Sequence, residues 1–192
     1  MSKRMRIAQI AGEYPPLQGG LGDFTHELSR ALVELGHDLH VLTKLTPGLP
    51  EREDAAGIHV HRLSPRWGWH TLRQLNTFIA EQKPEIVNLQ YQAAAYQMHG
   101  AINLLPRFIG RRVPVVVTFH DLRAPYLFPK AGLVRWRSML ELAHSAAAVI
   151  VTNEEDRARL ASSAAPSTAF SSIRSQATRS TTPRTARPRS PE

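Results

Sequence analysis

The stretch RIAQIAGEYPPLQGGLGDFTHELSRALVELGHDLHVLT, residues 6–43, gives the clearest indication of the fold. Its first six residues are mostly apolar, as in a short buried strand, and residues 12–22 form a loop rich in glycine and proline. Apolar residues at helical spacing follow, with Asp23 predicted as the helix N-cap and Gly36 as the residue just past the helix end. A second apolar strand is predicted around residues 39–42. This order of strand, loop, helix and strand is typical of a parallel βαβ unit.

The rest of the chain repeats this alternation as far as about residue 160. Further strands are predicted at 58–63, 86–89, 113–119 and 148–152. Helices are predicted at 72–82, at 98–108 with a break or an end at Pro106, at 133–143 and from 154. Continuous apolar runs such as Val115-Val116-Val117 suit a parallel sheet that is covered on both faces. We therefore predict an α/β fold with a Rossmann-like, doubly wound, mainly parallel sheet.

Composition excludes several classes of protein. A chain of 192 residues has room for one large domain. It has no cysteine, which excludes a disulfide framework, a thiolate metal site and a cysteine nucleophile. No apolar run approaches the roughly 18–20 residues of a membrane-spanning helix, and the apolar run after the basic start is shorter than a secretory signal needs. We expect a soluble, cytoplasmic protein.

The last 32 residues differ from the rest. The net charge is +8, and the segment 161–192 supplies half of it through five arginines and one glutamate. The remaining residues there are almost wholly Ser, Thr, Ala and Pro, which offer too little apolar surface to offset the entropy of ordering. We predict a folded domain at residues 1–160 and a disordered tail at 161–192. Charge alone lets such a tail touch nucleic acid or anionic lipid, but a solvated coil explains it more simply, so we expect no specific nucleic-acid partner.

Ligands of doubly wound sheets bind outside the carboxyl ends of the strands, which directs attention to the loops that follow them. Gly19 and Gly20 stand directly before the first helix. Glycines there let a ligand approach the backbone, and the exposed helix N–H groups attract phosphate or sugar oxygens. A plain turn explains the same glycines, and the residues alone leave both interpretations open.

Two nucleotide-binding fingerprints are absent. The spacing of the glycines does not match G-x-G-x-x-G, and the second strand ends at Thr43-Lys44, where a nicotinamide dinucleotide site has an acid for the ribose. The P-loop pattern G-x-x-x-x-G-K-[ST] is also missing. These absences disfavour a Rossmann oxidoreductase or an ATPase, although the oxidoreductase stays as an alternative that an NADH-dependent signal would revive.

Histidines provide the other candidate site residues. His120 follows the strand at 113–119 where it leaves the core, and it can donate to a sugar hydroxyl or, when protonated, bind a phosphate oxygen. Capping of loop backbone groups is the alternative. His59 and His61 share one strand face and could suggest a metal pair, but no third ligand lies beside them in the sequence. An exposed polar strand face explains them more simply, so we predict no metal site.

Four motifs together resemble a known family. Residues 6–43, PEIVNLQY (84–91), VVVTFHD (115–121) and VIVTNEEDR (149–157) are similar, in this order, to the opening of family 4 glycosyltransferases with the GT-B fold. The resemblance covers about residues 6–160. It implies the N-terminal, acceptor-side half of an enzyme in which two Rossmann-like domains face each other across a cleft. It also implies transfer from a nucleotide-sugar with retention of anomeric configuration, with neither a catalytic metal nor a cofactor beyond that co-substrate.

The resemblance also implies roles for individual residues. Gly19 and Gly20 would bring backbone N–H groups to the donor diphosphate and sugar. His120 matches the histidine that contacts the donor sugar, as the catalytic residue. Gln90 and Tyr91 would lie on the acceptor side. Such a reaction requires stabilisation of a departing diphosphate and an oxocarbenium-like sugar, so correctly aimed hydrogen-bond donors matter more than a nucleophile.

The family's donor domain has no counterpart in these 192 residues. The resemblance to the family ends near residue 160, which we interpret as a truncation or a change of reading frame. We therefore expect the chain to be inactive alone. Two alternatives stay open: a non-catalytic module that binds a sugar or a phosphorylated ligand, and a half-site completed by a separate donor-domain chain. If the acceptor is a lipid, we expect peripheral membrane contact as well.

Overall fold

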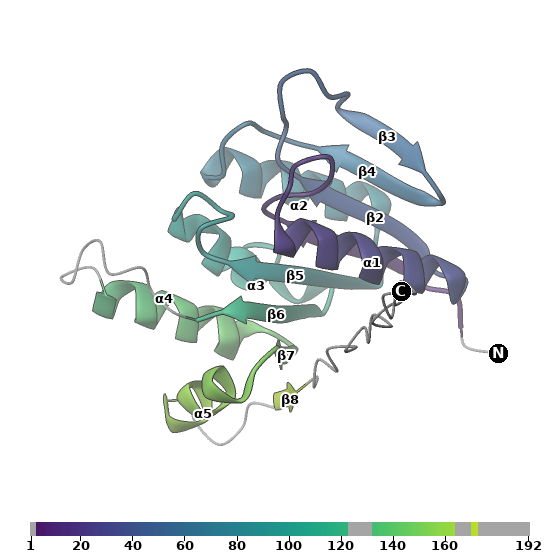
Figure 1. Cartoon of the computed structure of the whole chain (residues 1–192). Helices are drawn as coiled ribbons and strands as arrows, with labels where there is room; N and C mark the ends of the chain where they lie inside the picture. The colour runs from purple at the N-terminus through teal and green to yellow at the C-terminus, as the bar shows by residue number, and fades with distance from the viewer. Residues whose placement is uncertain (1–2, 123–131, 164–169, 173–192) are drawn as a thin grey trace, which may run out of the picture.

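The computed structural model describes residues 3–122, 132–163 and 170–172 as one sheet with helices on both faces (Figure 1). The strand order is β3-β4-β2-β1-β5-β6-β7-β8. Every neighbouring pair is parallel except β3 and β4, which are antiparallel. The predicted Rossmann-like, mainly parallel sheet is therefore confirmed.

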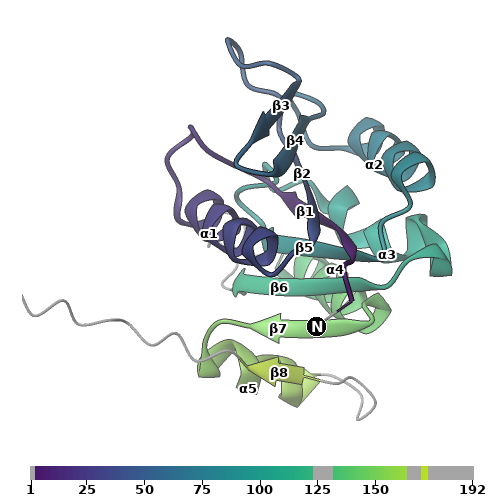
Figure 2. The same ribbon diagram turned by 90° about the vertical axis from the view of Figure 1, so that its right-hand side faces the viewer.

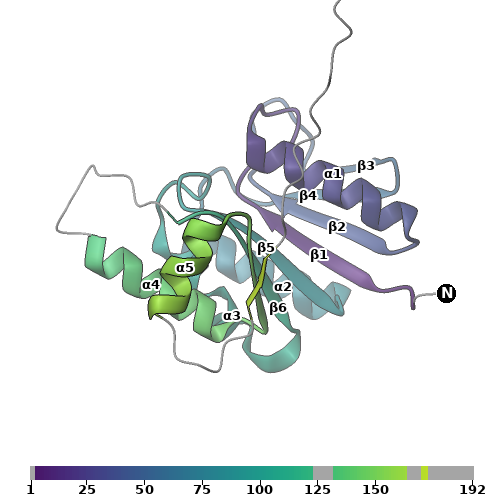
Figure 3. The same cartoon turned by 60° about the horizontal axis from the view of Figure 1, so that its bottom comes forward.

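The elements follow the predicted alternation. The strands are β1 (Arg6–Ala11), β2 (Asp38–Thr43), β3 (Arg52–Ala55), β4 (Ile58–Arg62), β5 (Ile86–Gln92), β6 (Val115–Asp121), β7 (Ala148–Val151) and β8 (Phe170–Ser172). The helices are α1 (Gly20–Glu34), α2 (Trp69–Gln82), α3 (Leu105–Phe108), α4 (Gly132–Ser145) and α5 (Glu154–Ser163), with 3-10 turns η1 (Gly100–Leu104) and η2 (Gly110–Arg112). β3 and α5 lie at opposite ends of the sheet (Figure 3).

Helices cover the two faces unequally. Helix α1 lies on one side of the sheet and α2, α3 and α4 lie on the other (Figure 2). We call these sides the α1 face and the α2 face. The α2 face carries the larger core, in which Leu89, Val117 and Phe119 are completely buried. A smaller cluster on the α1 face joins Val41 and Ile58 to neighbouring apolar side chains.

Helix α1 packs closely on the sheet because the helix residues that face the sheet are small. Gly22, Thr25 and Ser29 are buried, and both hydroxyls donate to the carbonyl four residues earlier at 2.7 Å. The predicted N-cap at Asp23 is wrong, because α1 begins at Gly20 with Gly19 as its N-cap. Asp23 lies in the first turn instead, where its negative charge suits the helix dipole.

Two other expectations were incomplete. β3 was missed because its four residues are all exposed and show no apolar pattern. The helix expected at 98–108, with a break or an end at Pro106, is instead the 3-10 turn η1 followed by the short helix α3, and η2 comes after it. Proline stands at the start of α3, and Gly110 has a positive φ of 65° that ends it, so one continuous helix does not form.

The end of the described chain extends the fold past residue 160. α5 starts behind Asn153, whose Oδ1 accepts the N–H of Asp156 at 2.8 Å, and it continues to Ser163. β8 then pairs in parallel with β7. These residues therefore join the sheet, whereas the remainder of the predicted tail lies outside the described residues. Within the described ranges, no helix is long and apolar enough to cross a bilayer.

Candidate functional site

The predicted site residues lie at the carboxyl edge of the three central strands. β1 leads into the loop that carries Gly19 and Gly20, and Gln90 and His120 lie near the ends of β5 and β6. Ala11 pairs with Gln90, and Gln90 pairs with Thr118. Because these strands are parallel neighbours, the loops that follow them meet at one edge of the sheet.

His120 contacts the first turns of α1. Its ring packs edge-on against the ring of Phe24, with 4.8 Å between the centroids. Phe24 lies four residues after Gly20, which is about one helical turn. The structure therefore brings the glycine-lined helix start and the histidine to the same side of the sheet edge.

Gln90 holds the His120 ring. The two side chains lie 2.8 Å apart, from Nε2 of His120 to Oε1 of Gln90. Burial lowers the pKa of His120 to about 4, so its ring is neutral near pH 7. In this arrangement Nε2–H donates to Gln90 and Nδ1 is left as a hydrogen-bond acceptor. A neutral imidazole held in this way can accept a hydrogen bond from a sugar hydroxyl.

Gln90 and Tyr91, which were both expected on the acceptor side, lie on opposite faces of the sheet. Successive side chains of a strand point to opposite faces, so Gln90 lies on the α1 face and Tyr91 on the α2 face. Gln90 is completely buried beneath His120. Tyr91 is also buried, and its ring packs against Tyr96 and Phe119. Burial raises the pKa of the Tyr91 hydroxyl, which the nearby Asn103 amide and Arg135 charge partly oppose.

Packing explains some of the glycines at this edge. A Cβ on Gly12 would lie 2.6 Å from Ala95, and one on Gly22 would lie 3.3 Å from the backbone of Tyr14. A Cβ on Gly19 would collide with the flexible Glu13 carboxylate. At Gly20 it would meet no described atom within 4 Å. The space at the first residue of α1 is therefore open to a ligand.

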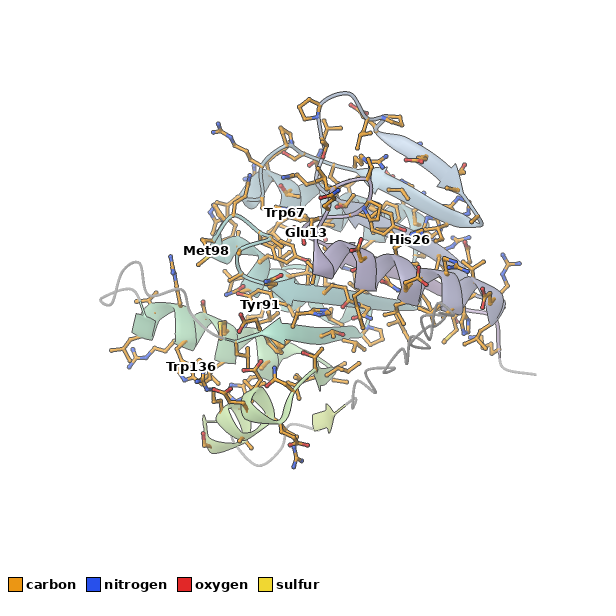
Figure 4. All side chains as sticks on the ribbon, in the orientation of Figure 1. Glu13, His26, Trp67, Tyr91, Met98 and Trp136 are labelled. Atoms are coloured by element: carbon orange, nitrogen blue, oxygen red, sulfur yellow. The ribbon has the colours of Figure 1, made fainter. Side chains whose placement is uncertain are left out.

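Two aromatic residues connect the segments at this edge through hydrogen bonds to backbone carbonyls. The Tyr96 hydroxyl lies 2.8 Å from the carbonyl oxygen of Gln90 and 3.1 Å from that of Ile10, so it joins β5 to β1. The indole of Trp67 donates to the Gly12 carbonyl at 3.3 Å, near Glu13 and the start of α1 (Figure 4). No spacing in the sequence identifies Tyr96, because its partners are carbonyls that only the fold brings close.

His59 and His61 lie in a histidine cluster on the α2 face. Nδ1 of His40 lies 3.1 Å from Nε2 of His61, and the His40 ring stacks on His59. The prediction of an exposed polar face holds for His59, whose side chain is 42% exposed. It is wrong for His61, which packs against Phe78 and whose pKa burial lowers to about 4. In the part of the chain that the structure describes, no group of three or more His, Cys, Asp or Glu side chains is arranged to hold a metal.

Comparison with known proteins identifies the family to which this domain belongs. Residues 19–170 match the family model described as the glycosyl transferase 4-like domain. The chain belongs to this family. The match begins at the N-cap of α1 and extends to the first residue of β8, so it includes the whole sheet edge described above except the end of β1 and the start of its loop.

Relatives of this glycosyl transferase 4-like domain include an uncharacterised glycosyltransferase of Methanocaldococcus jannaschii, 30% identical over 124 residues. That match covers 64% of this chain and 30% of the relative. A glycogen synthase of Mycobacterium tuberculosis is 49% identical over 45 residues, which is 23% of this chain and 11% of that protein. The chain therefore spans less than a third of the length of either relative.

Solved structures share the fold. A sucrose-phosphate synthase structure from Thermosynechococcus elongatus superposes with a TM-score of 0.62 at 17% identity, covering 88% of this chain and 87% of that chain. A glycosyltransferase from Rickettsia africae gives a TM-score of 0.60 at 15% identity, covering 90% of this chain and 43% of that chain. At these identities the likeness shows the fold alone.

Proposed function

We propose that this chain is the N-terminal, acceptor-side domain of a retaining, metal-independent glycosyltransferase that uses a nucleotide-sugar. The contact between His120 and Phe24 carries the proposal, because it joins the open start of α1 to an imidazole at the exit of β6. Membership of the glycosyl transferase 4-like family supports the reaction class. We also propose a cytoplasmic location, and peripheral membrane contact if the acceptor is a lipid.

Each residue has a separate role in this proposal. Gly19 and Gly20 present backbone N–H groups at the positive end of the α1 dipole, which suits the donor diphosphate. His120 forms a hydrogen bond to a hydroxyl of the donor sugar, and Gln90 fixes the ring orientation through the 2.8 Å contact. A neutral His120 avoids placing a full charge beside the oxocarbenium-like sugar that develops during transfer.

We further propose that the chain does not turn over by itself. The described residues form a single sheet, and a GT-B active site needs a second Rossmann-like domain to bind most of the nucleotide-sugar. A separate donor-domain chain, or a donor domain in a longer form of this protein, would supply it. The alternative is a non-catalytic module that binds a sugar or a phosphorylated ligand, which the open backbone at Gly20 would also serve.

The test combines the purified chain with a donor-binding domain supplied as a separate polypeptide. We expect release of nucleoside diphosphate and a product with retained anomeric configuration, as read by NMR, only when both parts are present. Turnover by the chain alone would contradict its proposed dependence on a second domain. Nucleotide-sugar binding without turnover in the combined sample would favour the alternative of a binding module.

Gly20→Ala sharpens this test. The added Cβ meets no described atom within 4 Å, so we expect the thermal unfolding midpoint to stay within a degree or two of the parent. The same methyl group would obstruct a diphosphate lying against the α1 N-terminus and weaken nucleotide-sugar binding. Unchanged affinity in this variant would remove Gly20 from the donor site.

A further inference from the structure

A second candidate site lies beside Tyr91, on the opposite face of β5 from Gln90. It is a small pocket of about 40 Å³ between the end of β5, the turn η1 and the first half of α4. Its lining includes Tyr91, Tyr96, Met98, Asn103 and Arg135. Tyr91 and Met98 are labelled in Figure 4. Because Tyr91 pairs with Phe119, the residue before His120, the pocket adjoins the proposed transfer site along the same sheet edge.

Asn103 leaves a buried oxygen without a hydrogen-bond donor. Its side chain is 97% buried, and its Nδ2 donates to Ser138 Oγ at 2.8 Å. Its Oδ1 has no hydrogen-bond partner among the described residues. A buried carbonyl oxygen without a donor is unfavourable. The Tyr91 hydroxyl lies beside the same amide, and a ligand group that donates a hydrogen bond to Oδ1 would complete this polar set.

Arg135 supplies complementary donors. Its half-buried side chain lines the pocket, and no hydrogen bond or ion pair within the described part of the chain engages its guanidinium. The guanidinium carries five N–H donors and accepts nothing. A group that accepts from Arg135 and donates to Asn103 would satisfy both side chains at once.

The loop beside the pocket is held in an unfavourable conformation. Gln97 and Met98 both have positive φ values, 54° and 58°, although neither is glycine. Consecutive left-handed residues of this kind are costly and tend to occur at ligand sites. The Gln97 amide oxygen accepts the N–H of Trp67 at 3.0 Å, so the fold holds this conformation in place.

The hydrogen-bonding requirements select the ligand chemistry. The lining carries both the Arg135 guanidinium and the Asp121 carboxylate, so an anion is repelled by Asp121 and a cation by Arg135. A hydroxyl group both donates and accepts. A volume of about 40 Å³ admits such a group but not a sugar ring.

We propose that this pocket binds one hydroxyl or hydroxymethyl group of a neutral sugar acceptor. The inference rests on the proposed function, and it specifies an uncharged, hydroxyl-rich acceptor. The acceptor's remaining hydroxyls then lie outside the pocket.

The experiment is an NMR titration of the isotope-labelled full chain with three neutral hexoses, glucose, galactose and mannose, and separately with inorganic phosphate. We expect at least one hexose to cause saturable shifts at the Asn103 side-chain amide and the Gly100 backbone amide, and phosphate to cause none there. Arg135→Gln should weaken that hexose about tenfold, as expected for loss of a hydrogen bond to a charged group. Arg137→Gln is the matched control, because Arg137 is exposed two residues further along α4.

Three outcomes would overturn the proposal. If no hexose causes saturable shifts at these amides, the pocket holds only water. If phosphate causes them and Arg135→Gln abolishes them, the pocket is an anion site. If Arg135→Gln and Arg137→Gln weaken the hexose equally, Arg135 has no specific role.

The outcome separates this inference from the proposed function. Hexose binding at Asn103 in a protein that shows no transfer with a donor domain would refute the function and leave the pocket assignment standing. Transfer without a response at Asn103 would refute the pocket assignment and leave the proposed function standing.

Discussion

On the α2 face, β5 and β6 present Leu89, Val117 and Phe119 to the helices, and on the α1 face the same two strands present Gln90, Thr118 and His120. The first set packs into the main apolar core. The second set forms polar contacts, including a 3.2 Å hydrogen bond from Thr118 to Asn88 and the 2.8 Å contact between His120 and Gln90. Alternation along a strand thus lets one pair of strands support both the core and the candidate site. We expect substitutions on the two faces to affect different properties.

The largest effect on stability is expected on the α2 face. Leu89 is completely buried at the centre of the sheet, so Leu89→Ala removes apolar contacts and leaves a cavity. We expect it to lower the free energy of unfolding by about 2–5 kcal/mol, measured by denaturant unfolding. Gln90→Ala at the neighbouring position provides the comparison. A larger loss for Gln90→Ala than for Leu89→Ala would contradict the division between the faces.

The largest effect on activity is expected on the α1 face. In an enzyme assembled with its donor domain, His120→Ala should lower the rate of transfer by about 10²–10³-fold, the usual effect of removing one aimed hydrogen-bonding group. Stability should fall much less than in Leu89→Ala. His144→Ala is the matched control, because His144 is exposed near the end of α4. Unchanged transfer in His120→Ala would exclude this residue from the site.

A fall in pH tests both faces at once. Burial lowers the pKa to about 4 for His61 on the α2 face and for His120 on the α1 face. In the unfolded chain a histidine takes up its proton near pH 6.5, so between about pH 6.5 and 4 the unfolded state binds more protons. The free energy of unfolding should therefore fall as the pH falls through this window. Each histidine contributes at most about 1.4 kcal/mol per pH unit, less what solvent screening removes.

Denaturant unfolding at pH 7.5, 5.5 and 4.5 checks this slope. His120→Gln and His61→Gln should each flatten part of it, and His144→Gln should leave it unchanged. Stability that rises on acidification in this range would show that the two rings are protonated in the folded protein.

The smallest predicted effect is a gain in stability. Gln9 is completely buried on the α1 face, and neither polar atom of its side chain has a partner among the described residues. Gln9→Met keeps the shape and removes this unsatisfied amide, so we expect the free energy of unfolding to rise by about 1 kcal/mol. A loss of stability instead would show that a buried water or another polar partner satisfies Gln9.

Much of the fold could be predicted from the sequence, because apolar runs and punctuating glycines mark each parallel strand and its crossover. Residues 6–43 alone predict β1, the body of α1 and β2, and Gly36 ends the helix with a φ of +87° as expected. β3 could not be predicted, since an exposed edge strand has no apolar alternation. The start of α1 was misplaced because Gly19, with no capping side chain, occupies the N-cap.

The candidate site was predictable only in part. His120 and the glycine loop each follow a buried strand, so the rule for parallel sheets places them at one edge. The family resemblance placed Gln90 and Tyr91 on one side of the site, but strand alternation sends their side chains to opposite faces. Asn103 and Arg135 lie 32 positions apart, and only the packing of η1 against α4 brings them into one pocket.

The hairpin formed by β3 and β4 also opposes self-association of the protein. β3 places Arg52, Glu53 and Asp54 along the open border of the sheet, and all three are exposed. Charges on such a border discourage another polypeptide from adding its backbone there. Without β3, the alternating Ile58 and Val60 of β4 would form that border and offer a template for self-association. Its three charged residues therefore help to keep separate copies of the protein from aggregating.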